Sequence, residues 1–160
     1  MNRVIYVVGA VLGLIWAVAI VYLPQQLEIP FVMGPVGLAL GFIAPGAVTA
    51  LMIAVIAARR FFSNALIDGT PPKPGSRAAR DQAVLSNTIE QLVLALVIWP
   101  FVANTLGGAL IVVMGLGFAL ARLLFWAGYH IYPPLRAFGF GATFYPTLLA
   151  AIWAVLAWMG

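Results

Sequence analysis

Cysteine is absent from this sequence of 160 residues, and histidine occurs only once. The lack of cysteine excludes disulfide bonds, thiolate metal sites and a cysteine nucleophile, so any thiol chemistry must use a thiol from another molecule. No residues stand at metal-ligand spacing around His130, so a metal site is not predicted. The sequence also lacks a Gly-rich phosphate loop, a plausibly placed Ser-His-Asp set and a glycosidase-like pair of carboxylates.

Charged residues are scarce as well. They make up 8% of the chain, against about 25% in soluble domains, while 64% of the residues are apolar and the mean hydropathy is +1.10. This composition is typical of an integral membrane protein, and the chain is so short that one membrane domain uses nearly all of it. The net charge of +4 fits the loop asymmetry that orients membrane proteins, and no DNA-binding motif accompanies it. The predicted partner is therefore the lipid bilayer and not nucleic acid.

Apolar segments of sufficient length to cross a membrane occur five times, since a transmembrane helix needs about 20 residues. They are expected at residues 4–23, 36–58, 77–104, 109–129 and 141–159. A cleaved signal peptide is the alternative for the first segment. The apolar region of a signal peptide has about 7–15 residues, and no small-x-small cleavage pattern lies between Ile20 and Gln26, so a retained helix is favoured.

Proline, glycine and polar residues predict where the connections between these helices lie. Loops are expected at residues 24–35, 61–76, 105–108 and 131–140. The third of these is so short that the third and fourth helices must form a hairpin. Gly115 and Gly117 are positions where neighbouring helices could approach each other closely.

Basic residues all fall on one side of the membrane if the N-terminus lies inside the cell. With five spans, this inner side receives Arg3, Arg59, Arg60, Lys73, Arg77, Arg80, Arg122 and Arg136. This distribution satisfies the positive-inside rule. A chain without the first segment would place everything after Arg59 in the same way. The sequence therefore predicts a cytoplasmic N-terminus and a polar cluster on the cytoplasmic side.

Polar residues continue into the start of the third span, over Arg77–Gln91. At 100° per residue, Arg80, Asn87 and Glu90 lie within an arc of about 80° on one helix face. An ionised carboxylate inside a span is costly and normally faces a partner or a water-filled cavity. Glu90 is therefore expected either to pair with an arginine inside the bundle or to contact a ligand. Arginines at the span ends have a further alternative, which is to reach lipid headgroups.

A second polar set lies where the fourth and fifth spans meet. Arg122 and Tyr129 are seven residues apart and share a helix face. Arg136 follows after another seven residues, beyond a pair of prolines, so it is expected to start the fifth helix and reach back across the site. Together with Arg59 and the start of the third span, these residues converge at the inner membrane face. The convergence predicts a site for an anion.

The order and spacing of these residues resemble the MAPEG family, the membrane-associated proteins in eicosanoid and glutathione metabolism. The resemblance rests on Arg59 and Arg60 within Ile-Ala-Ala-Arg-Arg-Phe-Phe, on the spacing Arg-x6-Asn-x2-Glu from Arg80, and on the spacing Arg-x6-Tyr-x6-Arg from Arg122. It covers about residues 38–160. The run Asn-Thr-Ile-Glu-Gln at 87–91 is similar to a bacterial branch, so the bacterial inner membrane is the expected location.

The resemblance implies an all-α membrane protein in which residues 36–160 form a four-helix bundle and residues 1–35 add a transmembrane helix and an external loop. It also implies a homotrimer that binds glutathione, as a co-substrate, between subunits near the cytoplasmic face. Residues that would contact glutathione by position are Arg59, Asn87, Glu90 and Tyr129, and Arg80 and Arg122 complete the expected substrate-binding set. Arg136 would be the catalytic residue that stabilises the thiolate, which attacks a lipophilic electrophile or a lipid hydroperoxide.

Two positions depart from the family pattern. Ala83 stands where many members carry a second ligand-binding arginine, and Phe125 replaces a tyrosine that some enzymes have one turn before Tyr129. Loss of a charge-assisted contact would weaken tripeptide binding by about 1.5–3 kcal/mol unless Arg80 or Arg77 replaces it. Two hypotheses therefore stay open: a glutathione transferase or peroxidase acting on lipophilic substrates, and a non-catalytic scaffold or lipid-binding protein that keeps the fold. A small transporter or channel is disfavoured because no span carries a polar stripe along its full length.

Overall fold

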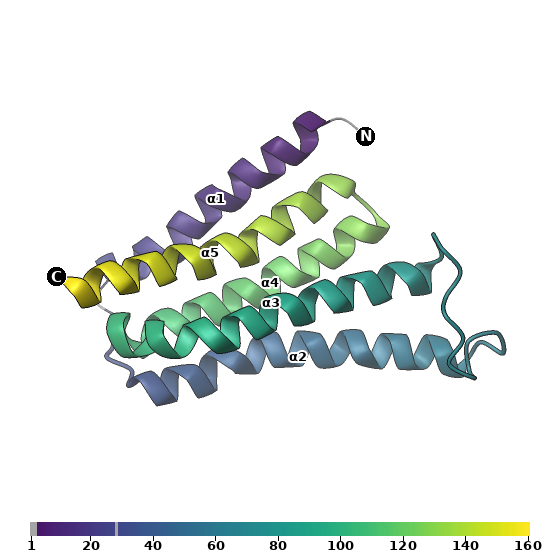
Figure 1. Ribbon diagram of the computed structural model, residues 1–160, viewed down its shortest axis with the longest axis horizontal. Coiled ribbons are helices and arrows are strands. Elements are labelled where there is room, and N and C mark those ends of the chain that lie inside the picture. Colours follow the sequence, from purple (N-terminus) through teal and green to yellow (C-terminus); the bar gives the residue numbers. More distant parts are fainter. Residues whose placement is uncertain (1–2, 28) are drawn as a thin grey trace.

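The computed structural model describes residues 3–27 and 29–160, except for the side chain of Pro133. The described chain consists of long helices joined by short connections (Figure 1). The helices are α1 (Arg3–Gln26), α2 (Gly34–Phe61), α3 (Arg77–Leu106), α4 (Gly108–His130) and α5 (Pro133–Met159). Each is long and apolar enough to cross a membrane. The prediction of an all-α integral membrane protein with five spans is therefore confirmed.

Helix α4 is the central element of the bundle, and it contacts each of the other four helices. Its side chains Leu110, Ile111, Met114 and Phe118 are almost completely buried, and Trp99 of α3 packs among them. The indole of Trp99 donates a hydrogen bond to Thr147 Oγ1 over 3.2 Å, so its polar group is satisfied inside the core. The core thus joins α3, α4 and α5 near the middle of the bundle.

Glycines allow α2 and α4 to pack with their backbones in contact. A Cβ atom on Gly115 would lie 1.9 Å from the carbonyl oxygen of Gly41, and one on Gly37 would lie 2.3 Å from the Cα of Gly108. Gly117 is in contact with α1, where a Cβ would lie 3.1 Å from Ile20 Cδ1. Close approach at Gly115 and Gly117, as the sequence predicted, is confirmed.

The first helix belongs to the packed structure. Along α1, the residues at four-residue spacing, Gly9, Gly13, Ala17 and Val21, are buried, and the helix packs on α5 and α4. A Cβ on Gly13 would lie 3.0 Å from backbone atoms of Gly141 in α5. The remaining faces of α1 carry exposed apolar side chains, which suit contact with lipid. Figure 1 shows α1 lying along α5 on the side away from α2.

Two loop predictions were wrong because proline was taken as a signal for the end of a helix. Helix α1 continues through Pro24 to Gln26, and α5 begins at Pro133 instead of near residue 141. Prolines occupy the first two positions of α5, where backbone N–H groups have no partner within the helix, whereas Pro24 lies within the last turn of α1. The predicted hairpin is correct and tighter than expected, since only Gly107, with φ +97°, separates α3 from α4.

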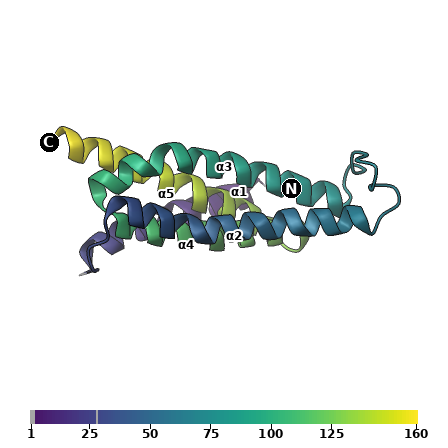
Figure 2. The same ribbon diagram turned by 90° about the horizontal axis from the view of Figure 1, so that it is seen from below.

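The N-terminal end of α1, the α2–α3 connection and the α4–α5 connection lie at one end of the bundle, and the C-terminus lies at the other (Figure 1). The α2–α3 connection, residues 62–76, extends beyond the helix ends (Figure 2). Basic residues at the end of α2 and at the starts of α3 and α5 therefore gather at the same end of the molecule. We call this end the basic end.

Candidate functional site

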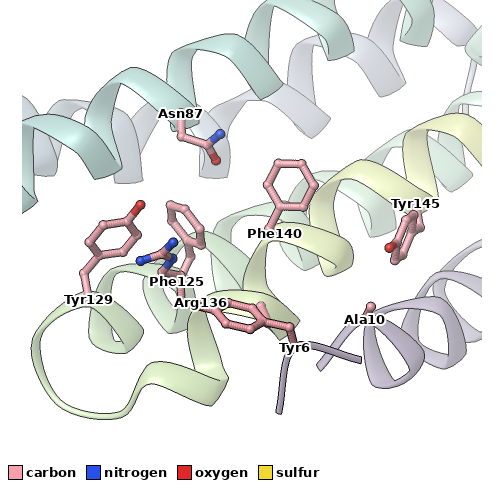
Figure 3. A pocket seen from close by; sticks show the side chains of 9 residues that line it. Tyr6, Ala10, Asn87, Phe125, Tyr129, Arg136, Phe140 and Tyr145 are labelled. Carbon is pink, nitrogen blue, oxygen red and sulfur yellow. The ribbon is translucent and has the colours of Figure 1, made fainter. Parts of the chain in front are cut away.

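A pocket of about 370 Å³ lies between α1, α3, α4 and α5 near the basic end. This volume is within the range of about 300–1,000 Å³ that is typical of small-molecule sites. Figure 3 shows the labelled side chains surrounding it. The pocket is lined by Tyr6, Ala10, Asn87, Phe125, Tyr129, Arg136, Ala137, Phe140 and Tyr145.

Arg136 is the cation among these lining residues. It lies in the first turn of α5, and its Cζ is 4.7 Å from the centre of the Tyr129 ring on α4, a distance at which a guanidinium is attracted to the ring face. The backbone of Arg136 is also fixed, because a Cβ on Gly128 would lie 2.3 Å from the Arg136 backbone nitrogen. Arg136 therefore starts the fifth helix and reaches back to Tyr129, as the sequence predicted.

Arg122 is completely buried behind the pocket and holds α3, α4 and α5 together. One of its terminal nitrogens donates to Asn87 Oδ1 over 2.8 Å, and the other donates to the Gly139 carbonyl oxygen over 3.0 Å and to Thr143 Oγ1. Its Cζ lies 4.4 Å from the centre of the Phe125 ring. Arg122 thus reaches the pocket through Asn87, whose amide it orients.

Asn87 presents its amide toward the pocket from α3 (Figure 3). With its oxygen bound by Arg122, its nitrogen donates to Glu90 Oε2 over 3.3 Å. The Asn87 nitrogen therefore donates away from Arg122, toward the carboxylate of the exposed Glu90. Within the described residues of this chain, the carboxylate of Glu90 pairs with this amide and forms no ion pair with an arginine, so of the two alternatives for Glu90 the one with an arginine partner is not seen, and ligand contact stays a prediction.

Asp81 forms a second polar cluster beside the pocket. Its carboxylate, 1% exposed, lies 2.5 Å from Arg59 Nε, accepts a hydrogen bond from Trp126 Nε1 over 2.7 Å and lies 2.7 Å from His130 Nε2. These contacts join α2, α3 and α4. Asp81 was missed by sequence reasoning, although a carboxylate one turn inside a span needs a cation and Arg59 ends the preceding helix.

A family model described as MAPEG family matches residues 38–156. The chain belongs to the MAPEG family. Searches of the curated proteins and of the solved structures found no match. The matched residues include Arg122, Asn87, Tyr129 and Arg136, whereas the pocket residues on α1 lie outside the match.

The structure brings together only part of the set that the MAPEG resemblance predicted. Asn87, Tyr129 and Arg136 line the pocket, and Arg122 supports Asn87 from behind. Arg59 is engaged with Asp81 outside the lining.

Arg80 and Glu90 are exposed on α3. The sequence predicted that Arg80, Asn87 and Glu90 point the same way from one face of this helix. In the structure Asn87 faces the bundle, whereas Arg80 and Glu90 do not. Ala83 is also exposed and leaves no gap in the pocket, whereas Phe125 lines the pocket and packs against Tyr129 with ring centres 5.1 Å apart.

Three aromatic residues that the resemblance did not identify also line the pocket: Tyr6, Phe140 and Tyr145. Phe140 and Tyr145 come from α5, which the MAPEG model covers, but Tyr6 comes from α1, which lies outside the matched residues. No pattern in the sequence assigned these aromatic residues to a site, because their positions depend on how α1 and α5 pack.

Proposed function

We propose that this MAPEG protein binds glutathione, or a related thiol, at the pocket and acts as a glutathione-dependent transferase or peroxidase on lipophilic substrates. The observation that supports this most directly is the position of Arg136. Its guanidinium lies beside Tyr129 and Asn87 at a pocket whose other walls are mainly aromatic. A fixed cation at such a pocket favours an anionic ligand, and a thiolate is one.

The chemistry follows from the effect of a cation on a thiol. A free thiol has a pKa of about 8.5, and a neighbouring guanidinium lowers that pKa by favouring the charged form. Arg136 would therefore raise the thiolate fraction of bound glutathione at neutral pH. In the transferase reaction the thiolate sulfur forms a bond to an electrophilic carbon as the leaving group departs with its electron pair. In the peroxidase reaction two glutathione molecules are oxidised to their disulfide while a hydroperoxide is reduced to an alcohol and water.

Exposed polar residues on α3 support the proposal of a homotrimer. Arg80 and Glu90 are exposed in the single chain, on the same helix from which Asn87 lines the pocket. An ionisable side chain facing lipid is costly, whereas one facing a neighbouring subunit can be paired. We expect native mass spectrometry to give about three times the chain mass of 17.1 kDa. A monomer that is fully active would contradict the trimer without contradicting glutathione binding.

Calorimetric titration of the purified protein with glutathione tests the function, together with the ultraviolet absorbance of the thiolate. We expect binding, and we expect Arg136→Gln to lower the thiolate fraction about tenfold at neutral pH while Arg136→Lys retains part of it. Arg60→Gln is the matched control, since Arg60 lies near the same end of the bundle and does not line this pocket.

No binding at millimolar glutathione would overturn the proposal. A phospholipid headgroup at Arg136, with wild-type stability in both Arg136 variants, would instead support the scaffold or lipid-binding hypothesis. We place the pocket on the cytoplasmic side of the bacterial inner membrane, because the basic end is expected to face the cytoplasm.

A further inference from the structure

The N-terminal helix contributes two residues to the pocket that holds Arg136. Tyr6 and Ala10 are four residues apart on α1, so they share a helix face, and both line the pocket. Figure 3 shows the ring of Tyr6 extending from α1 toward Arg136 and Phe125. Helix α1 lies outside residues 38–156, which the MAPEG model matches. This wall of the pocket is therefore an addition of this chain to the matched region.

Close packing fixes the position of α1. A Cβ on Gly9 would lie 2.6 Å from Ala137 Cβ and 2.9 Å from the Phe138 backbone nitrogen, and Gly13 meets Gly141 one turn further along. Ala137 also lines the pocket. The contact that seats α1 on α5 is thus adjacent to the pocket, and it holds Tyr6 and Ala10 in place along the pocket wall.

We propose that α1 is part of the ligand site, with Tyr6 contacting the molecule that Arg136 attracts and the small side chain of Ala10 leaving room for it. The inference rests on the proposed function for the identity of that molecule, but not for the existence of the site. Tyr6 is a specificity-determining residue in this arrangement, because it borders the pocket without supplying a charge.

The chemistry of the walls describes the ligand. Five aromatic rings surround the space beside the one guanidinium among the lining residues, and they belong to Tyr6, Phe125, Tyr129, Phe140 and Tyr145. Aromatic walls bind apolar or flat groups, and the guanidinium binds an anionic group. The site therefore fits a single ligand that places an anionic end at Arg136 and an apolar body against Tyr6. It also fits two ligands, one that supplies the anionic group at Arg136 and one that supplies the apolar body.

The absence of cysteine makes single-cysteine labelling a direct test. Ala10→Cys and Val11→Cys introduce a thiol at adjacent positions of α1 in proteoliposomes, one lining the pocket and the other 51% exposed on the outside of the helix. We expect a water-soluble anionic methanethiosulfonate reagent to modify Cys at position 10 and not at position 11, because a thiol in hydrocarbon does not ionise. Equal modification at both positions would overturn the inference.

The charge of Arg136 provides a second readout that does not depend on glutathione. In the Ala10→Cys background, Arg136→Gln should slow the anionic reagent about threefold more than a neutral reagent of similar size, because a change in the thiolate fraction affects both reagents equally, whereas Arg136→Lys should preserve the ratio of the two rates. If the ratio of the anionic to the neutral rate is the same with and without a charge at position 136, α1 does not border the Arg136 pocket.

Binding and kinetics then test the role of Tyr6. We expect Tyr6→Ala to raise the KM for a lipophilic electrophile about fivefold with little change in kcat, and Tyr6→Phe to restore most of the affinity. Ala10→Leu should fill the pocket and weaken binding of S-methylglutathione, a ligand without a free thiol, while Val11→Leu should not.

The two proposals fail in different ways. If the wild-type protein binds no glutathione but the labelling pattern and its dependence on Arg136 hold, the proposed function is wrong and α1 still forms a wall of an anion site. If the wild-type protein binds glutathione and neither Tyr6→Ala nor Ala10→Leu changes any constant, the role of α1 in the site is wrong.

Discussion

At the scale of single residues, Arg122 is a buried cation whose hydrogen bonds join three helices. Its guanidinium is fully buried, and its terminal nitrogens bond to groups on α3 and α5 while its own backbone belongs to α4. A buried charge needs hydrogen-bond partners, and because Nε of Arg122 is buried without one among the described residues, the charge relies on the contacts of the two terminal nitrogens. The geometry of Asn87 in the pocket therefore depends on a residue that does not line the pocket.

Arg122→Met tests this dependence. The substitution leaves the amide oxygen of Asn87 without its donor and removes one of the donors to the Gly139 carbonyl oxygen, which still accepts from Thr143 Oγ1, so we expect a loss of about 2–4 kcal/mol in the free energy of unfolding. Unfolding in detergent followed by circular dichroism measures it. Arg80→Met is the control, because Arg80 is exposed, and an equal loss in both variants would contradict the structural role of Arg122.

Asp81→Asn removes the charge from the second polar cluster and keeps its shape. The amide can still accept one hydrogen bond, but the ion pair with Arg59 is lost, and a destabilisation of about 1–3 kcal/mol is expected. Asp68→Asn, in the exposed α2–α3 connection, should leave the thermal midpoint unchanged. A thermal midpoint for Asp81→Asn equal to that of wild type would show that the cluster does not hold α2, α3 and α4 together.

Sequence reasoning could place polar residues at the ends of helices, but it could not decide which of them meet. Arg136 and Tyr129 were correctly brought together because a short connection leaves little choice. Asp81 and Tyr6 were missed, since their contacts depend on the docking of separate helices. Hydropathy gives the depth of a residue in the membrane, whereas its partners depend on helix rotation.

At the scale of the helices, contact between α2 and α4 is set by glycine. Gly115→Ala puts a methyl group into the carbonyl oxygen of Gly41, so these two helices must separate and the protein should lose stability. Gly46→Ala is the matched control within α2, since no atom lies within 4 Å of the added methyl group. We expect a lowered thermal midpoint for Gly115→Ala only, and lowered midpoints in both variants would contradict the proposed backbone contact.

The helices themselves were predicted well because long apolar runs have few alternatives in a membrane. Their ends were predicted less well. The residues before Gly34 and after His130 include prolines, which indicate a loop in one context and a first helical turn in another. Only the geometry at each end distinguishes these two cases.

At the scale of the whole molecule, the arrangement of the helices predicts which connections share a side of the membrane. Asp68→Cys lies in the connection at the basic end, and Gln25→Cys lies at the other end of α1. In sealed inside-out vesicles, an impermeant maleimide should label position 68 and not position 25. Labelling of both positions, or the reverse pattern, would contradict a cytoplasmic basic end.

The family match describes most of the whole molecule but not its first helix. Residues 38–156 contain α3, α4 and almost all of α2 and α5, so the bundle around Arg122 belongs to the matched region. The docking of α1 could not be taken from the family. The small residues at four-residue spacing along α1 are visible in the sequence, but they indicate only that this face can pack closely and not which helix it meets.

The seating of α1 on α5 also bears on how the protein is made. Helix α1 is synthesised before α5 and packs chiefly against it, because Gly9 and Gly13 meet Ala137 and Gly141. During synthesis α1 must remain in the bilayer without this contact until α5 has inserted. The bundle therefore closes only after α5 has inserted, and a nascent chain that stops before α5 leaves a glycine-lined face of α1 open to other membrane helices.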